Sequence, residues 1–141
     1  MSRSARPLLL DTHVWIWLVN GDEQLSAGIR SAIDEAASHD RVWVSAISMW
    51  EVGMLEAKGR LRLTRDCLAW VREALAKPGL TLVPLSPSVA VGSSRLPGEF
   101  HGDPADRILV ATARELRATL VTSDGPILRY AAAGHVLALT A

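Results

Sequence analysis

The sequence has 141 residues, which is close to the commonest size of one folded domain and long enough to bury a substantial core. Hydrophobic residues make up 49% of it and the mean hydropathy is +0.19, which excludes a disordered or fibrous chain. Fifteen basic and fifteen acidic residues give a formal net charge of +0, so bulk charge alone does not indicate a nucleic-acid partner. We expect a single globular domain over residues 1–141.

Cysteine content and apolar run lengths indicate where the protein resides. One cysteine, Cys67, excludes an internal disulfide. The chain does not open with a basic stretch followed by a long apolar run, as a signal peptide would. Its apolar segments are far shorter than the roughly 20 residues needed to cross a bilayer. We therefore expect a cytoplasmic protein that does not associate with membranes.

The apolar pattern predicts strands that alternate with helices. Short apolar runs without strict alternation, typical of buried parallel strands, lie at residues 7–10, 42–44, 80–83, 119–121 and 136–139. Between them, apolar residues recur at helical spacing within residues 25–37, 47–54, 68–75 and 104–117. This alternation predicts an α/β fold, a three-layer α/β/α sandwich around a mainly parallel sheet of about five strands. No repeat or linker indicates a domain boundary.

Four acidic residues fall where such a fold places its ligands, beyond the carboxyl ends of the strands. Asp11 and Asp124 follow predicted strands, Glu51 lies in the helix after the second strand, and Asp106 lies in the first turn of the 104–117 helix. If these carboxylates converge, their repulsion raises their pKa values and destabilises the fold unless a divalent cation neutralises them. Oxygen ligands without His or Cys favour Mg²⁺ or Mn²⁺.

Each acid also has a purely structural explanation. Ser48 and Glu51 match a capping box, in which Glu51 would only bond a backbone amide. Asp103 suits the N-cap of the helix that follows it, and we favour capping as its role. Asp124 and Asp11 could likewise cap the helices that begin after them. The coincidence of all four acids just past a strand or in the early turns of a helix is therefore stronger support for a site than any one of them.

Four segments that carry these acids occur in a recognisable order. They read LLDTHVWIW at residues 9–17, SAISMWEV at 45–52, DPADRILVATA at 103–113 and LVTSD at 120–124. Together they resemble the motifs of PIN-domain ribonucleases, in particular the VapC-type toxins of type II toxin–antitoxin systems. The resemblance runs from about residue 8 to the C-terminus. One departure is Ala105, where many relatives carry an aromatic residue, which leaves the acids intact.

The resemblance implies a metal-dependent endoribonuclease in which metal-activated water attacks the RNA phosphodiester. Asp11 and Asp106 are the expected ligands of Mg²⁺ or Mn²⁺. Asp106 is preferred to Asp103 because it lies seven residues before Ala113, as the family's shared acid does. Glu51 could hold a ligand water or help to deprotonate the nucleophile, and Asp124 could complete the shell or bind a second cation. Supporting roles are open to Thr12, Asp103, Thr122 and Ser123.

The resemblance also implies partners, namely an RNA substrate, a cognate antitoxin protein and a second copy of the chain in a two-fold homodimer. The densest basic segment could contact the RNA backbone by counterion release, although a solvated connector explains it equally well. It contains Lys58, Arg60, Arg62 and Arg65. His13 could act as a general acid, but a structural role is favoured.

Two alternatives remain open beside the ribonuclease. A degenerate PIN fold could serve as a non-catalytic binding or scaffold module, which the loss of any one acid would have favoured. A nuclease that cleaves DNA is the closer rival, because metal-assisted phosphodiester hydrolysis does not by itself exclude DNA. A phosphatase with an aspartate nucleophile is disfavoured, because it needs a second aspartate where His13 stands.

Overall fold

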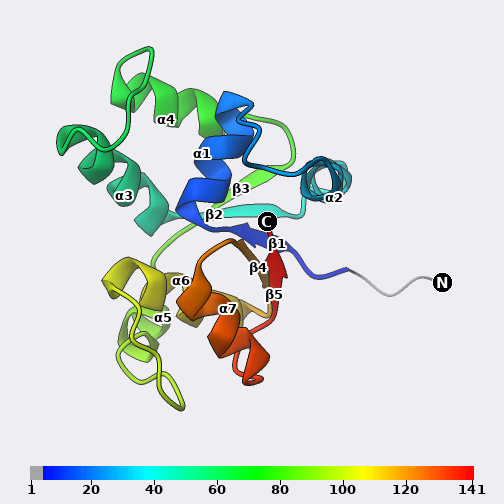
Figure 1. Cartoon of the computed structure of the whole chain (residues 1–141), viewed down its shortest axis with the longest axis vertical. Helices are drawn as coiled ribbons and strands as arrows, with labels where there is room; N and C mark the ends of the chain where they lie inside the picture. The colour runs from blue at the N-terminus through cyan, green and yellow to red at the C-terminus, as the bar shows by residue number, and fades with distance from the viewer. Residues whose placement is uncertain (1–4) are drawn as a thin grey trace.

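The computed structural model describes residues 5–141 as a parallel sheet with helices on both faces (Figure 1). The strand order is β3-β2-β1-β4-β5, and every neighbouring pair is parallel. This confirms the predicted three-layer α/β/α fold, with a sheet that is parallel throughout. The strands are β1 (Leu8–Leu10), β2 (Val42–Ser45), β3 (Leu80–Val83), β4 (Thr119–Thr122) and β5 (Ala138–Thr140). The helices are α1 (Thr12–Asn20), α2 (Ala27–Ala37), α3 (Ala46–Ala57), α4 (Cys67–Leu75), α5 (Pro87–Gly92), α6 (Pro104–Leu116) and α7 (Gly125–Ala132).

Helix starts follow from local sequence, because every helix of residues 5–141 begins after a serine or an aspartate. In each case the side-chain oxygen accepts a backbone N–H of the first turn, which would otherwise have no partner. Proline at the first helical positions strengthens the starts of α5, α6 and α7. The capping residues are Asp11, Ser26, Ser45, Asp66, Ser86, Asp103 and Asp124.

Two elements differ from the sequence prediction. The last strand was predicted at residues 136–139 but pairs with β4 over Ala138–Thr140, because buried Val136 packs against the α6–α7 side before the chain enters the sheet. Helix α5 was not predicted, since its six residues are too short to display a helical apolar period. Its start signal, Ser86 followed by Pro87, was present in the sequence.

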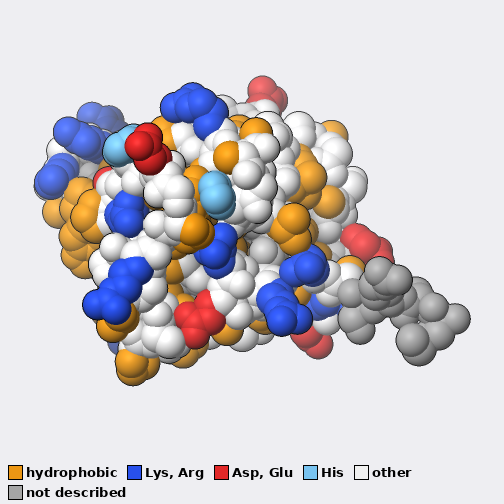
Figure 2. Space-filling view, turned by 90° about the horizontal axis from the view of Figure 1, so that it is seen from below, with side chains coloured by type: hydrophobic (Ala, Val, Ile, Leu, Met, Phe, Trp, Pro, Cys, Tyr) orange, Lys and Arg blue, Asp and Glu red, His pale blue; other side chains and the backbone are white. Residues whose placement is uncertain are grey.

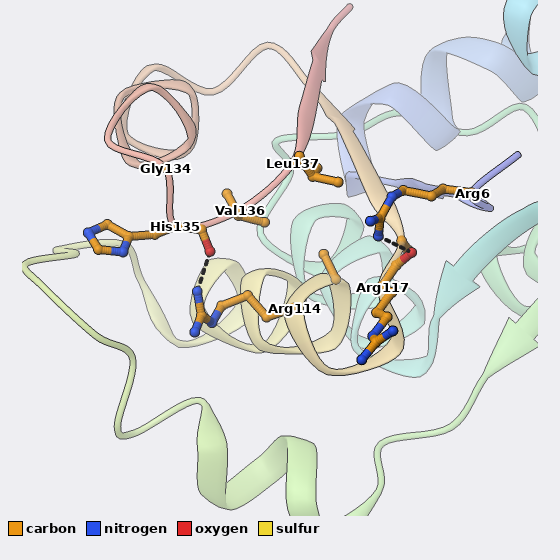
Figure 3. Close-up of a pocket in the computed structure, with 9 residues that line it drawn as sticks. Arg6, Arg114, Arg117, Gly134, His135, Val136 and Leu137 are labelled. Carbon is orange, nitrogen blue, oxygen red and sulfur yellow. Dashed lines mark hydrogen bonds between the residues drawn. The ribbon is translucent and has the colours of Figure 1, made fainter.

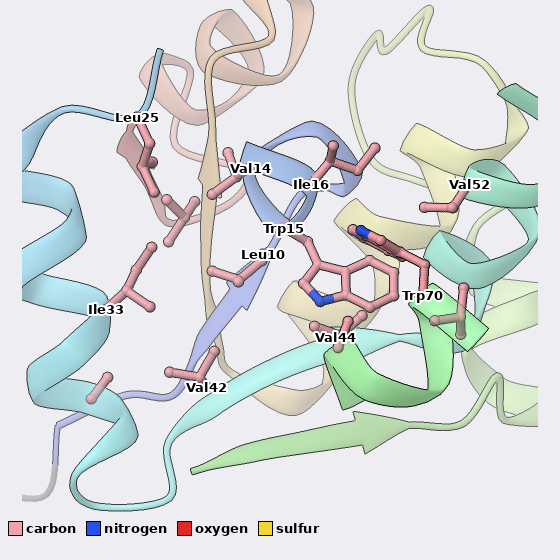
Figure 4. Packing of buried hydrophobic residues seen from close by; sticks show 14 residues of the cluster. Leu10, Val14, Trp15, Ile16, Leu25, Ile33, Val42, Val44, Val52 and Trp70 are labelled. Carbon is pink, nitrogen blue, oxygen red and sulfur yellow. The ribbon is translucent and has the colours of Figure 1, made fainter. Parts of the chain in front are cut away.

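The core is divided by the sheet into two apolar clusters, because successive strand residues point to opposite faces. Leu10 contributes to the cluster under α1, α2 and α4, and Leu9 to the cluster under α6 and α7. In the first cluster the fully buried ring of Trp15 meets Trp70 edge to face, with centroids 5.2 Å apart (Figure 4). Trp70 Nε1 donates to Asn20 Oδ1 at 3.0 Å, so the polar end of that indole is satisfied.

The parallel arrangement places the ends of β1 and β4 next to each other. Leu10 pairs with Val121, and the backbone N–H of Asp11 donates to the carbonyl of Val121 at 2.9 Å. The residues that follow these two strands therefore share the same edge of the sheet. Over the described part of the chain, no helix combines the length and the apolar character that crossing a bilayer requires.

Candidate active site

Asp11 is the most buried acid at this edge, with 8% of its surface exposed. It is the N-cap of α1, and its Oδ1 accepts the backbone N–H of Thr12 at 2.7 Å. Its Oδ2 accepts the hydroxyl of Thr122 at 2.6 Å. Burial nevertheless raises the pKa of Asp11, outweighing the two hydrogen bonds that favour the charged form. The carboxylate is thus fixed in position and incompletely compensated.

Glu51 is linked to Thr12, the residue that follows Asp11, and Thr12 is linked in turn to Ser48. Its Oε1 accepts a hydrogen bond from Thr12 Oγ1, which is also 2.8 Å from Ser48 Oγ. A hydroxyl has one proton and an ionised carboxylate only accepts, so Thr12 donates to Glu51 and Ser48 donates to Thr12. Burial, followed by the charges of Asp11 and Asp103, raises the pKa of Glu51.

The capping-box interpretation of Ser48 and Glu51 is wrong. Helix α3 begins at Ala46 with Ser45 as its N-cap, so Ser48 lies inside the helix and is fully buried. The Glu51 side chain bonds to Thr12 of another helix rather than to the start of its own. Glu51 therefore contributes a carboxylate to the shared edge of the sheet.

Asp103 and Asp106 lie at the start of α6 and have different surroundings. Asp103 is exposed and caps the helix, accepting the N–H of Asp106 at 2.8 Å, as the sequence favoured. The Asp106 carboxylate accepts no hydrogen bond from the described residues. Burial, then the charges of Asp103, Asp11, Asp124 and Glu51 in that order, raises its pKa to about 8.

Asp124 follows β4 and caps α7. Its Oδ2 accepts the N–H of Ile127 at 3.0 Å, and its own N–H donates to Thr122 Oγ1 at 3.0 Å. Because the same hydroxyl donates to Asp11, fully buried Thr122 holds the two aspartates in a fixed relation. Ser123, predicted as a supporting residue, is exposed, and its side chain makes no hydrogen bond within residues 5–141.

We define the carboxylate site as Asp11, Glu51, Asp106 and Asp124. Burial is the largest cause of the raised pKa values of Asp11, Glu51 and Asp106, and repulsion between the acids adds to it. Each of these charges acts on Asp106, and no Lys or Arg of residues 5–141 is among the charges that shift the three raised pKa values. His13, exposed on the first turn of α1, is the one basic group that acts on Asp11 and Glu51. Helix N-termini relieve only part of this repulsion.

The residues fit a divalent cation in chemistry but are not preassembled around one. Within residues 5–141, no three His, Cys, Asp or Glu side chains are close enough together to hold a metal as they stand. Both oxygens of Asp11, and one oxygen each of Asp124 and Glu51, accept a hydrogen bond that the chain itself supplies. A hard cation would take the open Asp106 carboxylate as an oxygen ligand, and its charge would lower the raised pKa values of the acids.

The predicted basic segment lies in the connection between α3 and α4. All of its cations are exposed, and Arg65 forms an ion pair with Glu73. The other cations make no salt bridge within residues 5–141, so they remain open to a solvent-side partner. They are Lys58, Arg60 and Arg62.

Ser48 is the residue of the site that sequence reasoning missed as a supporting group. It is buried and bonds Thr12, which in turn holds Glu51. Its position three residues before Glu51 was noticed, but it was interpreted as a helix cap. Placing Ser45 as the N-cap would have left Ser48 facing inward, next to Glu51 on the same helix.

Comparison with known proteins identifies the family and supports the fold. The pattern of the PIN domain matches residues 8–133. The chain belongs to the PIN-domain family. It is 40% identical over 117 residues to Ribonuclease VapC22 of Mycobacterium tuberculosis, a match that covers 83% of this chain and 86% of that protein. Within the family it is therefore a VapC-type ribonuclease homologue.

Solved structures share the PIN fold at low sequence identity. The DNA-bound VapBC complex of Salmonella typhimurium contains a chain that is 16% identical, with a TM-score of 0.70 and coverage of 96% of this chain and 98% of that one. VapBC2 of Rickettsia felis, bound to a DNA fragment from its promoter, gives 14% identity and a TM-score of 0.68, with coverage of 94% and 97%. FitAcB of Neisseria gonorrhoeae is 22% identical with a TM-score of 0.63, and the match covers 94% of this chain and 96% of that one.

Proposed function

We propose that this PIN-domain protein is a metal-dependent endoribonuclease that hydrolyses RNA phosphodiester bonds, and that it is the toxin of a toxin–antitoxin pair. The observation that supports the chemistry is Asp106, whose open carboxylate has a pKa raised to about 8 by burial and by the charges of the neighbouring acids. A bound divalent cation would offset these charges. The 40% identity to a VapC ribonuclease supports RNA as the substrate.

Each residue has a role that follows from its contacts. Asp11 and Asp106 would hold Mg²⁺ or Mn²⁺, since Asp11 is fixed by two hydrogen bonds and Asp106 is unengaged within the described residues. When bound, the cation supplies an attacking water of lowered pKa and neutralises the charge on the leaving oxygen. Glu51 presents an oxygen not bonded to Thr12, with which it can orient that water or take its proton.

The remaining groups keep the acids in place. Thr122 fixes Asp11 relative to Asp124, and Thr12 with Ser48 fixes Glu51. Asp124 would complete the shell around the cation or hold a second one. The exposed basic segment between α3 and α4 would contact the RNA backbone as it approaches the carboxylate site.

Cleavage by the purified protein tests the catalytic proposal. Wild type is expected to cut single-stranded RNA with Mg²⁺ or Mn²⁺ and not with EDTA, whereas Asp11→Asn and Asp106→Asn lose activity while keeping a folded structure with a cooperative melting transition. Asp34→Asn is the matched control, since Asp34 is an exposed acid on α2 with no hydrogen bond from its side chain within residues 5–141. Cleavage by either site variant near the wild-type rate contradicts the assignment.

A parallel arm with DNA of the same sequence separates the substrates. Preferential cleavage of DNA would make the protein a deoxyribonuclease, and no cleavage of either polymer with any divalent cation would favour the scaffold alternative. Cellular RNA is the expected substrate in the cytoplasm, where the thiol of the single cysteine, Cys67, stays reduced.

We further propose that the protein pairs with an antitoxin and with a second copy of itself. Large apolar side chains on the surface support both interfaces, among them Trp50 (58% exposed) and Leu68 (55%) on α3 and α4. The antitoxin would lie near the carboxylate site, where an arginine could replace the cation as partner of the acids. Light scattering that shows a monomer at all concentrations contradicts the homodimer. Normal growth of a host that expresses the active protein alone contradicts the toxin role.

A further inference from the structure

A pocket of about 340 Å³ lies at the edge of the sheet opposite to the acids. Three arginines line it together with Leu137, Arg6 from the segment that leads into β1 and Arg114 and Arg117 from the end of α6 (Figure 3). Ala118 forms part of its floor. We call it the arginine pocket. Among its lining residues there is no acid.

Two of the arginines are held in place by backbone carbonyls. Arg6 Nη1 donates to the carbonyl of Arg117 at 3.1 Å, and Arg114 Nη1 donates to the carbonyl of His135. A guanidinium has five N–H donors, so each keeps most of its donors after these bonds. The side chain of Arg117 makes no hydrogen bond within residues 5–141. The pocket thus presents fixed, exposed and unfilled donors.

The charges in the arginine pocket are not neutralised by neighbours. None of the three arginines takes part in a salt bridge within residues 5–141, and residues 1–4 contain no Asp or Glu. The C-terminus of α6 contributes about half a negative charge, against three positive charges. Figure 2, seen from the side of α5, α6 and α7, shows Lys and Arg side chains spread over this face with fewer acids between them.

The imidazole of His135 is not part of this donor set. Its ring stacks on Tyr130 with centroids 4.7 Å apart and packs against Gly98, where an added Cβ would lie 2.7 Å from Nε2. The ring therefore turns away from the arginines, as Figure 3 shows, and fixes the backbone whose carbonyl receives Arg114. A cluster made of arginines alone matches the planar, bidentate recognition of phosphate oxygens.

We propose that the arginine pocket binds phosphate groups in the backbone of a single nucleic-acid strand, at a site separate from the carboxylate site. Arg6 precedes β1 and Asp11 follows it, so the two sites lie at opposite ends of the strands, about 10 Å or more apart. A strand held in the pocket must run around the edge of the molecule to reach the acids. The pocket therefore adds affinity and does not define the bond that is cut.

Binding of a fluorescent 20-nucleotide single-stranded RNA in EDTA tests this, because no cleavage is needed. Arg117→Gln removes a side chain that holds no contact within residues 5–141. Loss of one phosphate contact on a single strand reduces the magnitude of the slope of log affinity against log salt by about 0.7. The affinity lost by the variant relative to wild type should therefore be about eight-fold larger at 0.05 M than at 1 M salt. Arg117→Lys should restore the salt slope, because it keeps the charge, but not the part of the affinity that depends on a bidentate guanidinium.

Arg72→Gln is the matched control, since Arg72 is an exposed arginine of α4 on the other face of the sheet. It should change affinity and slope little. An effect of Arg117→Gln no larger than that of Arg72→Gln overturns the proposal. If Arg117→Gln melts well below wild type, the same comparison is made with Arg6→Gln instead. This variant loses one hydrogen bond, from Arg6 to the carbonyl of Arg117.

Two further arms separate the possible ligands. Inorganic phosphate at constant ionic strength should raise the melting temperature of wild type more than that of Arg117→Gln. If phosphate stabilises wild type more than Arg117→Gln but the two proteins bind RNA with equal affinity, the pocket holds a small free anion and the assignment to a strand is wrong. The choice of RNA rests on the proposed function, but phosphate contacts do not read the sugar, so single-stranded DNA should respond alike. Because binding is measured in EDTA, this test gives the same result even if the protein proves not to cleave RNA.

Discussion

Replacing Asp106 by asparagine should stabilise the protein when no metal is present. In the folded chain the pKa of Asp106 is raised to about 8, from 3.8 for an unperturbed aspartate. The folded state therefore binds a proton that the unfolded state has released, so stability falls as pH rises from 3.8 to 8. The full loss of stability due to the charged Asp106 is present above pH 8, and it is absent below the pKa of the unfolded state.

The size of this effect follows from the same pKa values. Each pH unit between the folded and unfolded pKa corresponds to about 1.4 kcal/mol. Because the carboxyl is only half-buried, solvent screening reduces this destabilisation. We expect the charged Asp106 to lower the free energy of unfolding by about 2 kcal/mol at pH 9. An asparagine side chain at this position carries no charge to repel the other acids. Asp106→Asn should therefore melt about 4–8 °C above wild type at pH 9 in EDTA.

Thermal melting in EDTA at pH 5 and pH 9 checks this prediction. The gain from Asp106→Asn should be much smaller at pH 5, and Asp34→Asn, which alters an exposed acid on α2, should change little at either pH. An Asp106→Asn variant that melts at or below the wild-type temperature at pH 9 refutes the reasoning. It would mean that burial and the neighbouring acids do not penalise the charged form of Asp106 as the structure indicates.

Three other predictions follow from the same contacts. Mg²⁺ or Mn²⁺ should stabilise wild type, by about 2.7 kcal/mol at 100 times its Kd, and an unchanged response in the Asp11→Asn, Asp106→Asn double variant would place the cation elsewhere. Thr122→Val leaves Asp11 Oδ2 and the Asp124 N–H each without a partner; denaturant unfolding should show a loss of about 1–3 kcal/mol with reduced cleavage, and Thr122→Ser should restore both. Trp15→Ala, which empties the fully buried site against Trp70, should cost about 3–5 kcal/mol in the same unfolding assay, and a loss under about 1 kcal/mol would contradict the packing.

The sheet was predictable because its signals are local. A parallel strand buried on both faces reads as a short apolar run, and Leu8–Leu10 followed by Asp11 shows both the strand and the polar residue at its end. The start of α6 was equally clear, with Asp103 as N-cap and Pro104 at the first helical position. The start of β5 was not, since Val136 is as apolar as a strand residue but is buried outside the ladder.

The candidate site was predictable in its acids but not in the contacts that hold them. Thr12 bonds Glu51 across 39 residues of sequence, and Thr122 bonds Asp11 across 111. Such pairings depend on which strands become neighbours, which no local pattern states. Ser48 illustrates the limit, because its spacing to Glu51 fits a helix cap as well as it fits a buried link to Thr12.

Three of the acids at the sheet edge also start helices, which has a consequence for how the protein can change over time. Asp11, Asp103 and Asp124 each cap a helix through a side-chain oxygen, and asparagine caps a helix about as well as aspartate does. Under the proposed function, a single Asp-to-Asn replacement at Asp11 or Asp124 would thus remove activity while the folded surfaces persist. Lineages in which such a toxin is a burden would then have an easy route to an inert protein that still occupies its antitoxin.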